Sequence, residues 1–138
     1  MSRLKLMALD EEDLKVVSGL CQDAVLKVGE IDYLAREGRF ILALNRFVWE
    51  KENVKERRKT VLHFERVKSV KTQGIDLKDK DMVLSIMAVL FEQGDAPAGD
   101  IELVLAGDGA IRLNVECIEA QLADMPSAWE ARSRPTHE

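Results

Sequence analysis

The chain has 138 residues, of which 46% are hydrophobic and 33% are charged. This length and composition predict one folded domain and exclude an intrinsically disordered chain. No segment reaches the roughly 18 consecutive apolar residues that a membrane-spanning helix needs, so we expect no membrane partner.

The net charge of −5 is distributed unevenly along the chain. Residues 46–80 carry eleven basic and six acidic side chains, whereas residues 81–138 carry three basic and eleven acidic ones. The chain has two cysteines, Cys21 and Cys117, and its N-terminus lacks the apolar run of a signal peptide. We therefore expect a cytoplasmic protein with reduced thiols.

The first predicted elements are a short strand at residues 4–9 and a helix at residues 11–22. Asp10 is a suitable N-cap residue, and the three acidic residues after it suit the positive end of a helix dipole. Leu14 and Val17 lie on one face of that helix, as an amphipathic helix requires.

An extended region follows the helix. In its longest strand Phe40, Leu42 and Leu44 share one face, which we predict to be buried. The expected pieces are strands at 25–28 and 31–35, a turn at 36–38 and the long strand at 39–49.

The most polar run of the chain, EKENVKERRK at residues 50–59, has no apolar stripe and predicts an exposed loop. Residues 60–72 are extended again, but the apolar alternation changes phase near Glu65 and Arg66, as it does at a β-bulge. The run MVLSIMAVLF at residues 82–91 is apolar on both faces. It predicts a central strand, with a buried helix as the alternative.

The clearest pattern is a β-hairpin at residues 99–116. Apolar and other residues alternate on both sides of a glycine-rich turn at 107–109, which is typical of two antiparallel strands with one buried face. After the hairpin, Ile118, Leu122 and Met125 have the spacing of a short helix that ends before the next proline.

Together these elements predict an α+β fold with a mainly antiparallel sheet. The predicted order is a strand, a helix, about seven meandering strands and a final helix. This order favours a curled or barrel-like sheet and resembles that of pleckstrin-homology-like domains. We assign residues 1–125 to a single globular domain and residues 126–138 to a loosely ordered C-terminal tail.

Three stretches of the sequence carry a resemblance to a known family. They are LKLMALDEEDLKVVSGLCQDAVLKVGEI at residues 4–31, RFILALNRFVWE at 39–50 and GDIELVLAGDGAIRLNVECIEAQLADM at 99–125. They resemble a family of small bacterial proteins that is known only as a domain of unknown function. The resemblance implies a single cytosolic bacterial domain and implies no activity, cofactor or catalytic residue.

Few residues are candidates for catalysis. A Cys–His pair would need His63 to lie near Cys117, whose thiol would have a lowered pKa at the start of the predicted final helix. A structural or surface role for both residues is the simpler interpretation. The sequence contains no CxxC or HExxH pattern and no phosphate-binding glycine loop, so we expect no metal or other cofactor.

The locally basic segment is the main candidate for a binding surface. Acidic residues interleave with its cations, and the chain is acidic overall, whereas nucleic-acid-binding domains are typically basic. The residues of this candidate surface are Arg46, Trp49, Lys55, Arg57, Arg58, Lys59, Arg66 and Lys68.

These observations predict a non-enzymatic module that binds another protein. The opposite charges of the middle and the C-terminal third could also drive self-association into a homo-oligomer. The first alternative is a nucleic-acid accessory protein that uses residues 46–71, although nucleic acid is the less expected partner. The second is an enzyme with a Cys/His site.

Overall fold

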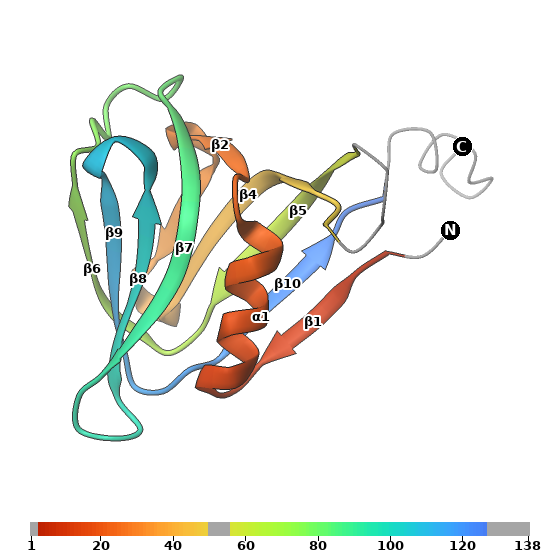
Figure 1. Ribbon diagram of the computed structural model, residues 1–138. Coiled ribbons are helices and arrows are strands. Elements are labelled where there is room, and N and C mark those ends of the chain that lie inside the picture. The colour runs from red at the N-terminus through yellow and green to blue at the C-terminus, as the bar shows by residue number, and fades with distance from the viewer. Residues whose placement is uncertain (1–2, 50–55, 127–138) are drawn as a thin grey trace, which may run out of the picture.

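The computed structural model describes residues 3–49 and 56–126, where one α-helix packs against a ten-stranded antiparallel sheet. Figure 1 shows the sheet curling around one side of the molecule, with the helix lying across its concave face. The helix is α1 (Glu11–Cys21), and the strands are β1 (Lys5–Ala8), β2 (Val25–Lys27), β3 (Ile31–Leu34), β4 (Arg39–Phe47), β5 (Arg57–Phe64), β6 (Val67–Gln73), β7 (Val83–Gln93), β8 (Gly99–Leu105), β9 (Ala110–Val115) and β10 (Ala120–Asp124).

The sheet is open. Its strand order is β1-β10-β5-β4-β2-β7-β8-β9-β6, and β3 pairs with β4 beside this path. The strands β1 and β6 stand at the two ends of this order and do not pair with each other. The sheet is therefore curled, as predicted, but it does not close into a barrel. The pleckstrin-homology-like arrangement is not confirmed.

The helix α1 is held by its N-cap and by a hydrogen bond to the sheet. The Asp13 amide donates to Asp10 Oδ1 at 2.8 Å, as the sequence predicted. In the middle of the helix, Ser18 Oγ accepts a hydrogen bond from the Val89 amide at 2.8 Å, next to an irregularity in the pairing of β7 with β8. A side chain of the helix thus accepts a hydrogen bond from a backbone amide of β7 that is not bonded within the sheet.

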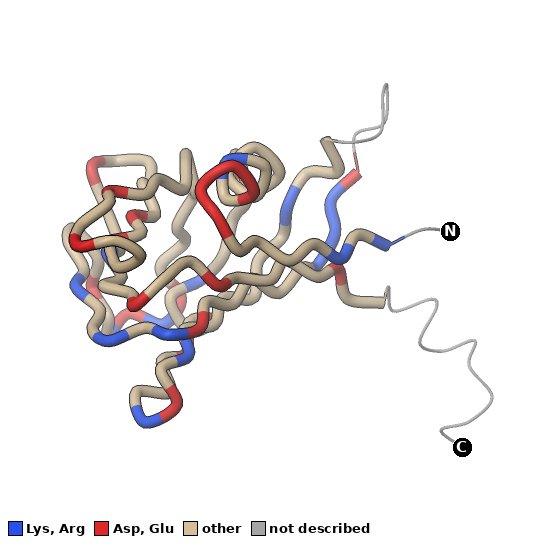
Figure 2. Tube along the Cα trace, turned by 90° about the horizontal axis from the view of Figure 1, so that it is seen from below, with Lys and Arg blue, Asp and Glu red and all other residues tan. Residues whose placement is uncertain are grey.

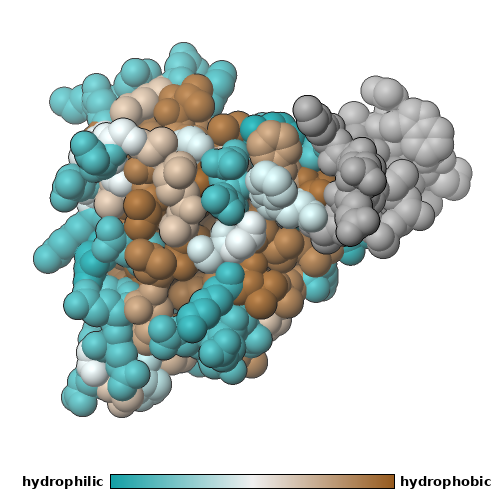
Figure 3. Space-filling view, in the orientation of Figure 1, coloured by the Kyte–Doolittle hydropathy of each residue, from teal (hydrophilic) through white to brown (hydrophobic). Residues whose placement is uncertain are grey.

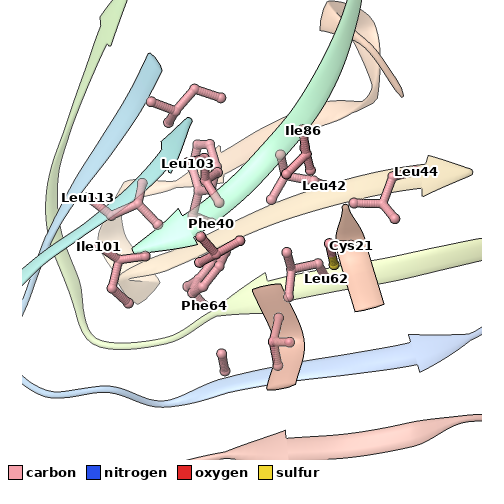
Figure 4. Close-up of a cluster of buried hydrophobic side chains, with 14 of the residues drawn as sticks. Cys21, Phe40, Leu42, Leu44, Leu62, Phe64, Ile86, Ile101, Leu103 and Leu113 are labelled. Atoms are coloured by element: carbon pink, nitrogen blue, oxygen red, sulfur yellow. The ribbon is translucent and has the colours of Figure 1, made fainter. Parts of the chain in front are cut away.

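The core lies between α1 and the concave face of the sheet. Phe40, Leu42 and Leu44 are buried, which confirms the predicted inner face of β4. Figure 4 shows how side chains from β4, β5, β7, β8 and β9 converge on this core, together with Cys21 from α1. The hairpin of β8 and β9 contributes three buried apolar residues from each strand, with the alternation predicted from its sequence.

The predicted C-terminal helix is wrong, because residues 120–124 form the strand β10. Ala120, Leu122 and Asp124 are buried while the residues between them are partly exposed, which is the period of a strand. Leu122 suits both patterns, and the pairing of β10 with β1 and β5 decides between them. The predicted tail lies, from residue 127 onward, outside the described residues.

The other boundaries follow the sequence closely, with one exception. Residues 82–91 form a strand rather than a helix, and the phase change before Val67 marks the bend from β5 into β6. At this bend Arg66 has a φ of +61°, and the Val67 amide donates to the Gly38 carbonyl at 2.9 Å. The exception is the loop predicted at residues 50–59: β5 already begins at Arg57, and residues 50–55 lie outside the described part. The described part of the chain contains no helix with both the length and the apolar character to cross a bilayer.

Candidate functional site

The convex side of β4 and β5 presents a continuous row of side chains, which we call the outer face. The two strands pair antiparallel, so residues that are directly opposite each other point to the same side of the sheet. Alternate residues of β4 and β5 fill the core, and the residues between them form the outer face. The opposed pairs of the outer face are Ile41 with His63, Ala43 with Val61, Asn45 with Lys59 and Phe47 with Arg57.

One end of the outer face carries an aromatic cluster made of Phe47, Trp49 and Arg57. The rings of Phe47 and Trp49 lie 5.2 Å apart at 53°, and the Arg57 guanidinium lies 3.8 Å from the centre of the Phe47 ring. The Trp49 indole N–H donates to the Gln22 carbonyl at 3.0 Å, and Arg57 donates to the Asn45 carbonyl at 3.1 Å. Trp49 is therefore held in place although 49% of it is exposed.

Beside the aromatic cluster the surface is hollowed, and we call this depression the apolar hollow. Its lining includes Val25, Ala43 and Val83, from three strands that are distant in sequence. Lys27 and Lys59 stand at its rim, where Lys59 Nζ lies 2.7 Å from Glu30 Oε1. The hollow and the cluster join through Asn45, which lies opposite both Lys59 and Val25.

Arg46 does not belong to the outer face, so its predicted place on an exposed surface is wrong. It lies on the same buried face of β4 as Phe40, Leu42 and Leu44, and its side chain has no exposed area. Its Nε lies 3.0 Å from Asp124 Oδ1 and its Nη2 lies 2.9 Å from Oδ2, a bidentate ion pair between β4 and β10.

Asp124 is the centre of a buried polar network that sequence reasoning missed. It also accepts hydrogen bonds from the Thr60 hydroxyl at 2.8 Å and from the Leu4 amide at 3.0 Å. Burial alone would raise the pKa of Asp124, but the hydrogen bonds from Arg46, Leu4 and Thr60 outweigh it and hold this pKa below its ordinary value. The network joins β4, β5, β10 and Leu4, the residue before β1, so its role is structural.

Most other cations of the predicted surface are paired with carboxylates. Arg58 is largely buried, with Nε 2.7 Å from Glu56 Oε2, and Lys59 binds Glu30 as described above. Arg66 lies at the bend before β6, with Nε 3.3 Å from Glu119 Oε1. Figure 2 shows basic and acidic residues interleaved along the described chain. Lys68 is exposed on β6, away from the aromatic cluster, and Lys55 lies outside the described residues.

The structure does not join the two candidate catalytic residues. His63 Nδ1 lies 2.9 Å from Glu65 Oε2, and the same oxygen accepts a hydrogen bond from Arg39 Nε at 2.8 Å. Cys117 lies in the turn between β9 and β10, so it does not stand at the start of a helix as predicted. Burial raises the pKa of the other thiol, Cys21, to about 12, although the Arg46 charge opposes this effect.

Neither ring nitrogen of His63 binds a cysteine in the part of the chain that the structure covers. Among the described residues, no three His, Cys, Asp or Glu side chains are placed to hold a metal ion.

The aromatic cluster thus contains two of the predicted surface residues, Trp49 and Arg57. Phe47 and the apolar hollow were not among the predicted residues. The alternation along β4 could have placed Phe47 on the outer face, but Val83 reaches the hollow only through the pairing of β7 with β2.

Comparisons with known proteins give one finding. A family model described as "Protein of unknown function (DUF2948)" matches residues 4–137. No curated protein and no solved structure gives a significant match.

Proposed function

Since the chain belongs to the DUF2948 family of proteins of unknown function, we propose a role from its own surface chemistry: a non-enzymatic module that binds an acidic, partly apolar segment of another protein on its outer face. The proposal places this module in the bacterial cytoplasm, as the sequence resemblance implies. Cys21 and Cys117 form no disulfide, which agrees with that placement.

The aromatic cluster is the observation that carries this proposal. Tryptophan and arginine dominate the binding energy of protein interfaces, above all where they stand preorganised on a rigid element. Trp49 and Arg57 are both fixed by hydrogen bonds and by the Phe47 ring. Binding a partner therefore costs little conformational entropy of these two side chains.

The composition of the surrounding surface indicates an acidic partner. The apolar hollow offers Val25, Ala43 and Val83 to a partner's apolar side chain, and the rim offers Lys27 and Lys59. Both lysines already bind acidic residues of this chain, Lys27 at 3.8 Å from Asp81 and Lys59 at 2.7 Å from Glu30. These pairs are exposed and so contribute little to stability, and a partner's carboxylates can replace them at small cost.

Apolar side chains also reach the surface on the opposite, helix-bearing side of the molecule. Figure 3 shows apolar areas on this side. Leu9 comes just before α1 and Val16 lies on α1, and both are more than half exposed. The ring contacts between described aromatic residues, Tyr33 with Phe40 and Phe47 with Trp49, involve neither of these two residues. This contrast favours the outer face as the binding surface.

The outer face suits a protein better than a nucleic acid. Phosphate binding needs cations that are available to the backbone, and the affinity grows with the number of phosphates neutralised. Of the predicted cations, Arg46 is buried, while Arg58 and Arg66 bind carboxylates. On the outer face this leaves Arg57 and Lys59, and two cations are a small set for phosphate recognition.

The experiment is a selection from a phage-displayed library of random peptides, with the full chain immobilised. We expect enrichment of peptides that combine Asp or Glu with apolar residues. The best peptide is then titrated calorimetrically against W49A/R57A and against the control L77A/R36A. The control changes an equally exposed apolar residue, since Leu77 is 50% exposed, and an exposed arginine outside the outer face.

We expect W49A/R57A to weaken binding by about thirtyfold or more, and L77A/R36A by less than about threefold. The single variant R57Q serves as a milder test if the double variant does not fold. The proposal fails if no acidic peptide is enriched, or if the two double variants bind equally. Retention of single-stranded RNA at low salt that is lost in R57Q would favour the nucleic-acid alternative instead.

A further inference from the structure

The strand β6 forms one end of the sheet, and its outer edge is open. It pairs with β9 on one side, and it is the last strand of the order. On the other side the Val67 amide binds the Gly38 carbonyl, and beyond this first residue no described strand pairs with β6. Figure 1 shows β6 at the margin of the molecule, with its length accessible from one side.

The side chains along this edge are polar and positively charged. Lys68 and Lys71 are exposed, as are Ser69, Thr72 and Gln73 between and after them. Neither lysine forms an ion pair with a carboxylate of the described residues, in contrast to Lys27 and Lys59 on the outer face. The neighbour of Lys71 across the ladder is Arg112, whose guanidinium binds Glu92, Asp100 and Glu102.

We propose that β6 accepts an extended acidic segment of a partner protein as an additional antiparallel or parallel strand. In this mode main-chain hydrogen bonds supply affinity, and side chains beside the edge supply specificity. Acidic residues of the added strand lie next to Lys68 and Lys71, neither of which forms an ion pair with a described carboxylate. This surface is separate from the outer face and does not depend on the function proposed above.

A second copy of this chain is a poorer occupant of the same edge. Pairing β6 with β6 of another copy would bring the lysines of both strands onto one ribbon, and like charges across a sheet are destabilising. Exposed lysines on edge strands commonly oppose such self-pairing. The strands β1 and β3 each pair on one side as well, but each has four residues against seven in β6 and therefore offers a shorter ladder.

The test uses two synthetic peptides and two charge-reversal variants. The probe is a peptide that alternates Asp and Val, and its counterpart carries Lys in place of Asp. Each peptide is titrated against the full chain at low salt, and hydrogen exchange is followed by mass spectrometry. The variant K68E/K71E reverses the edge charge, and the control K78E/K80E makes the same charge change on exposed lysines between β6 and β7.

We expect the acidic peptide to slow amide exchange in residues 67–73, and the basic peptide to leave exchange there unchanged. We expect K68E/K71E to weaken binding of the acidic peptide about tenfold, and K78E/K80E about twofold or less. The inference is overturned if the acidic peptide protects another segment or fails to bind, or if both variants lose affinity equally. Concentration-dependent protection of residues 67–73 without peptide would identify a second copy as the occupant and would also overturn it.

Discussion

Replacing Asp124 by Asn tests whether the buried network around this carboxylate holds the two ends of the described chain together. The side chain of Asp124 is 1% exposed and that of Arg46 is 0% exposed, so neither charge is solvated by water. The substitution keeps the shape of the side chain but removes the negative charge that Arg46 binds. It also weakens the acceptor for Thr60 Oγ and for the Leu4 amide.

The expected cost of D124N is about 3 kcal/mol of the free energy of unfolding, because removing one partner of a buried ion pair typically costs about 3–5 kcal/mol. The amide retains an oxygen acceptor, which places the value at the lower end of that range. Against a total stability of roughly 5–15 kcal/mol for a domain, this loss is large. Urea-induced unfolding followed by circular dichroism at neutral pH measures it directly.

The control is the double variant R46M/D124L, which replaces both charges by apolar side chains. Such replacements are often neutral or stabilising, because the desolvation penalty of both ions disappears. We therefore expect the double variant to unfold at a higher urea concentration than D124N. A loss below about 1 kcal/mol in D124N, or equal losses in D124N and the double variant, would refute the role assigned to the pair.

Acid unfolding gives an independent check of the same network. The folded-state pKa of Asp124 lies below the ordinary value of 3.8, so the folded protein binds fewer protons here than the unfolded one. Its contribution to stability is therefore complete above about pH 4 and is lost as the pH falls through the folded-state pKa. We expect the free energy of unfolding of D124N to depend less on pH in this window than that of the natural chain.

Three further predictions follow from local contacts. Cys21 is buried with a pKa raised to about 12, so we expect it to resist dithionitrobenzoate at neutral pH in the folded protein while the partly exposed Cys117 reacts; equal labelling rates would contradict this. D10A should cost about 1 kcal/mol in urea unfolding because the N-cap of α1 is lost, and D10N should cost only a few tenths. S18A should cost about 1–3 kcal/mol because the Val89 amide loses its acceptor, and an unchanged unfolding midpoint would show that water replaces the hydroxyl.

Local alternation in the sequence was sufficient to predict most strands. In the hairpin of β8 and β9 the buried residues recur at every second position on both sides of a glycine-rich turn, and neighbouring strands lie next to each other in the chain. The helix α1 is equally local, since Asp10 and the acidic first turn define its start. These elements need no information from distant residues.

The strand β10 shows where local patterns fail. Ile118, Leu122 and Met125 fit a helical period, and nothing nearby opposes that interpretation. The competing strand depends on pairing with β1, more than a hundred residues away, and with β5. Its last residue, Asp124, finds a buried partner only through that pairing.

The predicted binding surface grouped a buried arginine, Arg46, with an exposed one, Arg57. Charge counting alone placed Arg46 and Arg57 together, although their positions along β4 and β5 put them on opposite faces of the sheet. Arg46 shares the phase of Leu42 and Leu44, and an arginine in a buried phase indicates a buried acidic partner rather than a binding surface. Arg57 lies opposite Phe47, in the phase that faces water.

Arg46 and Arg57 lie on opposite faces of the sheet, so the charged middle segment contributes both to the core and to the exposed surface. The arginine that faces inward is neutralised by Asp124 and ties β4 to β10, which fixes the frame of the outer face. The arginine that faces outward lies on an aromatic ring instead of a carboxylate, so its hydrogen-bonding edge is not consumed by an acidic residue of the described chain. The proposed function therefore requires no strong ion pair to break before Arg57 meets a partner's carboxylate, whereas the buried Arg46 contributes to the stability of the fold.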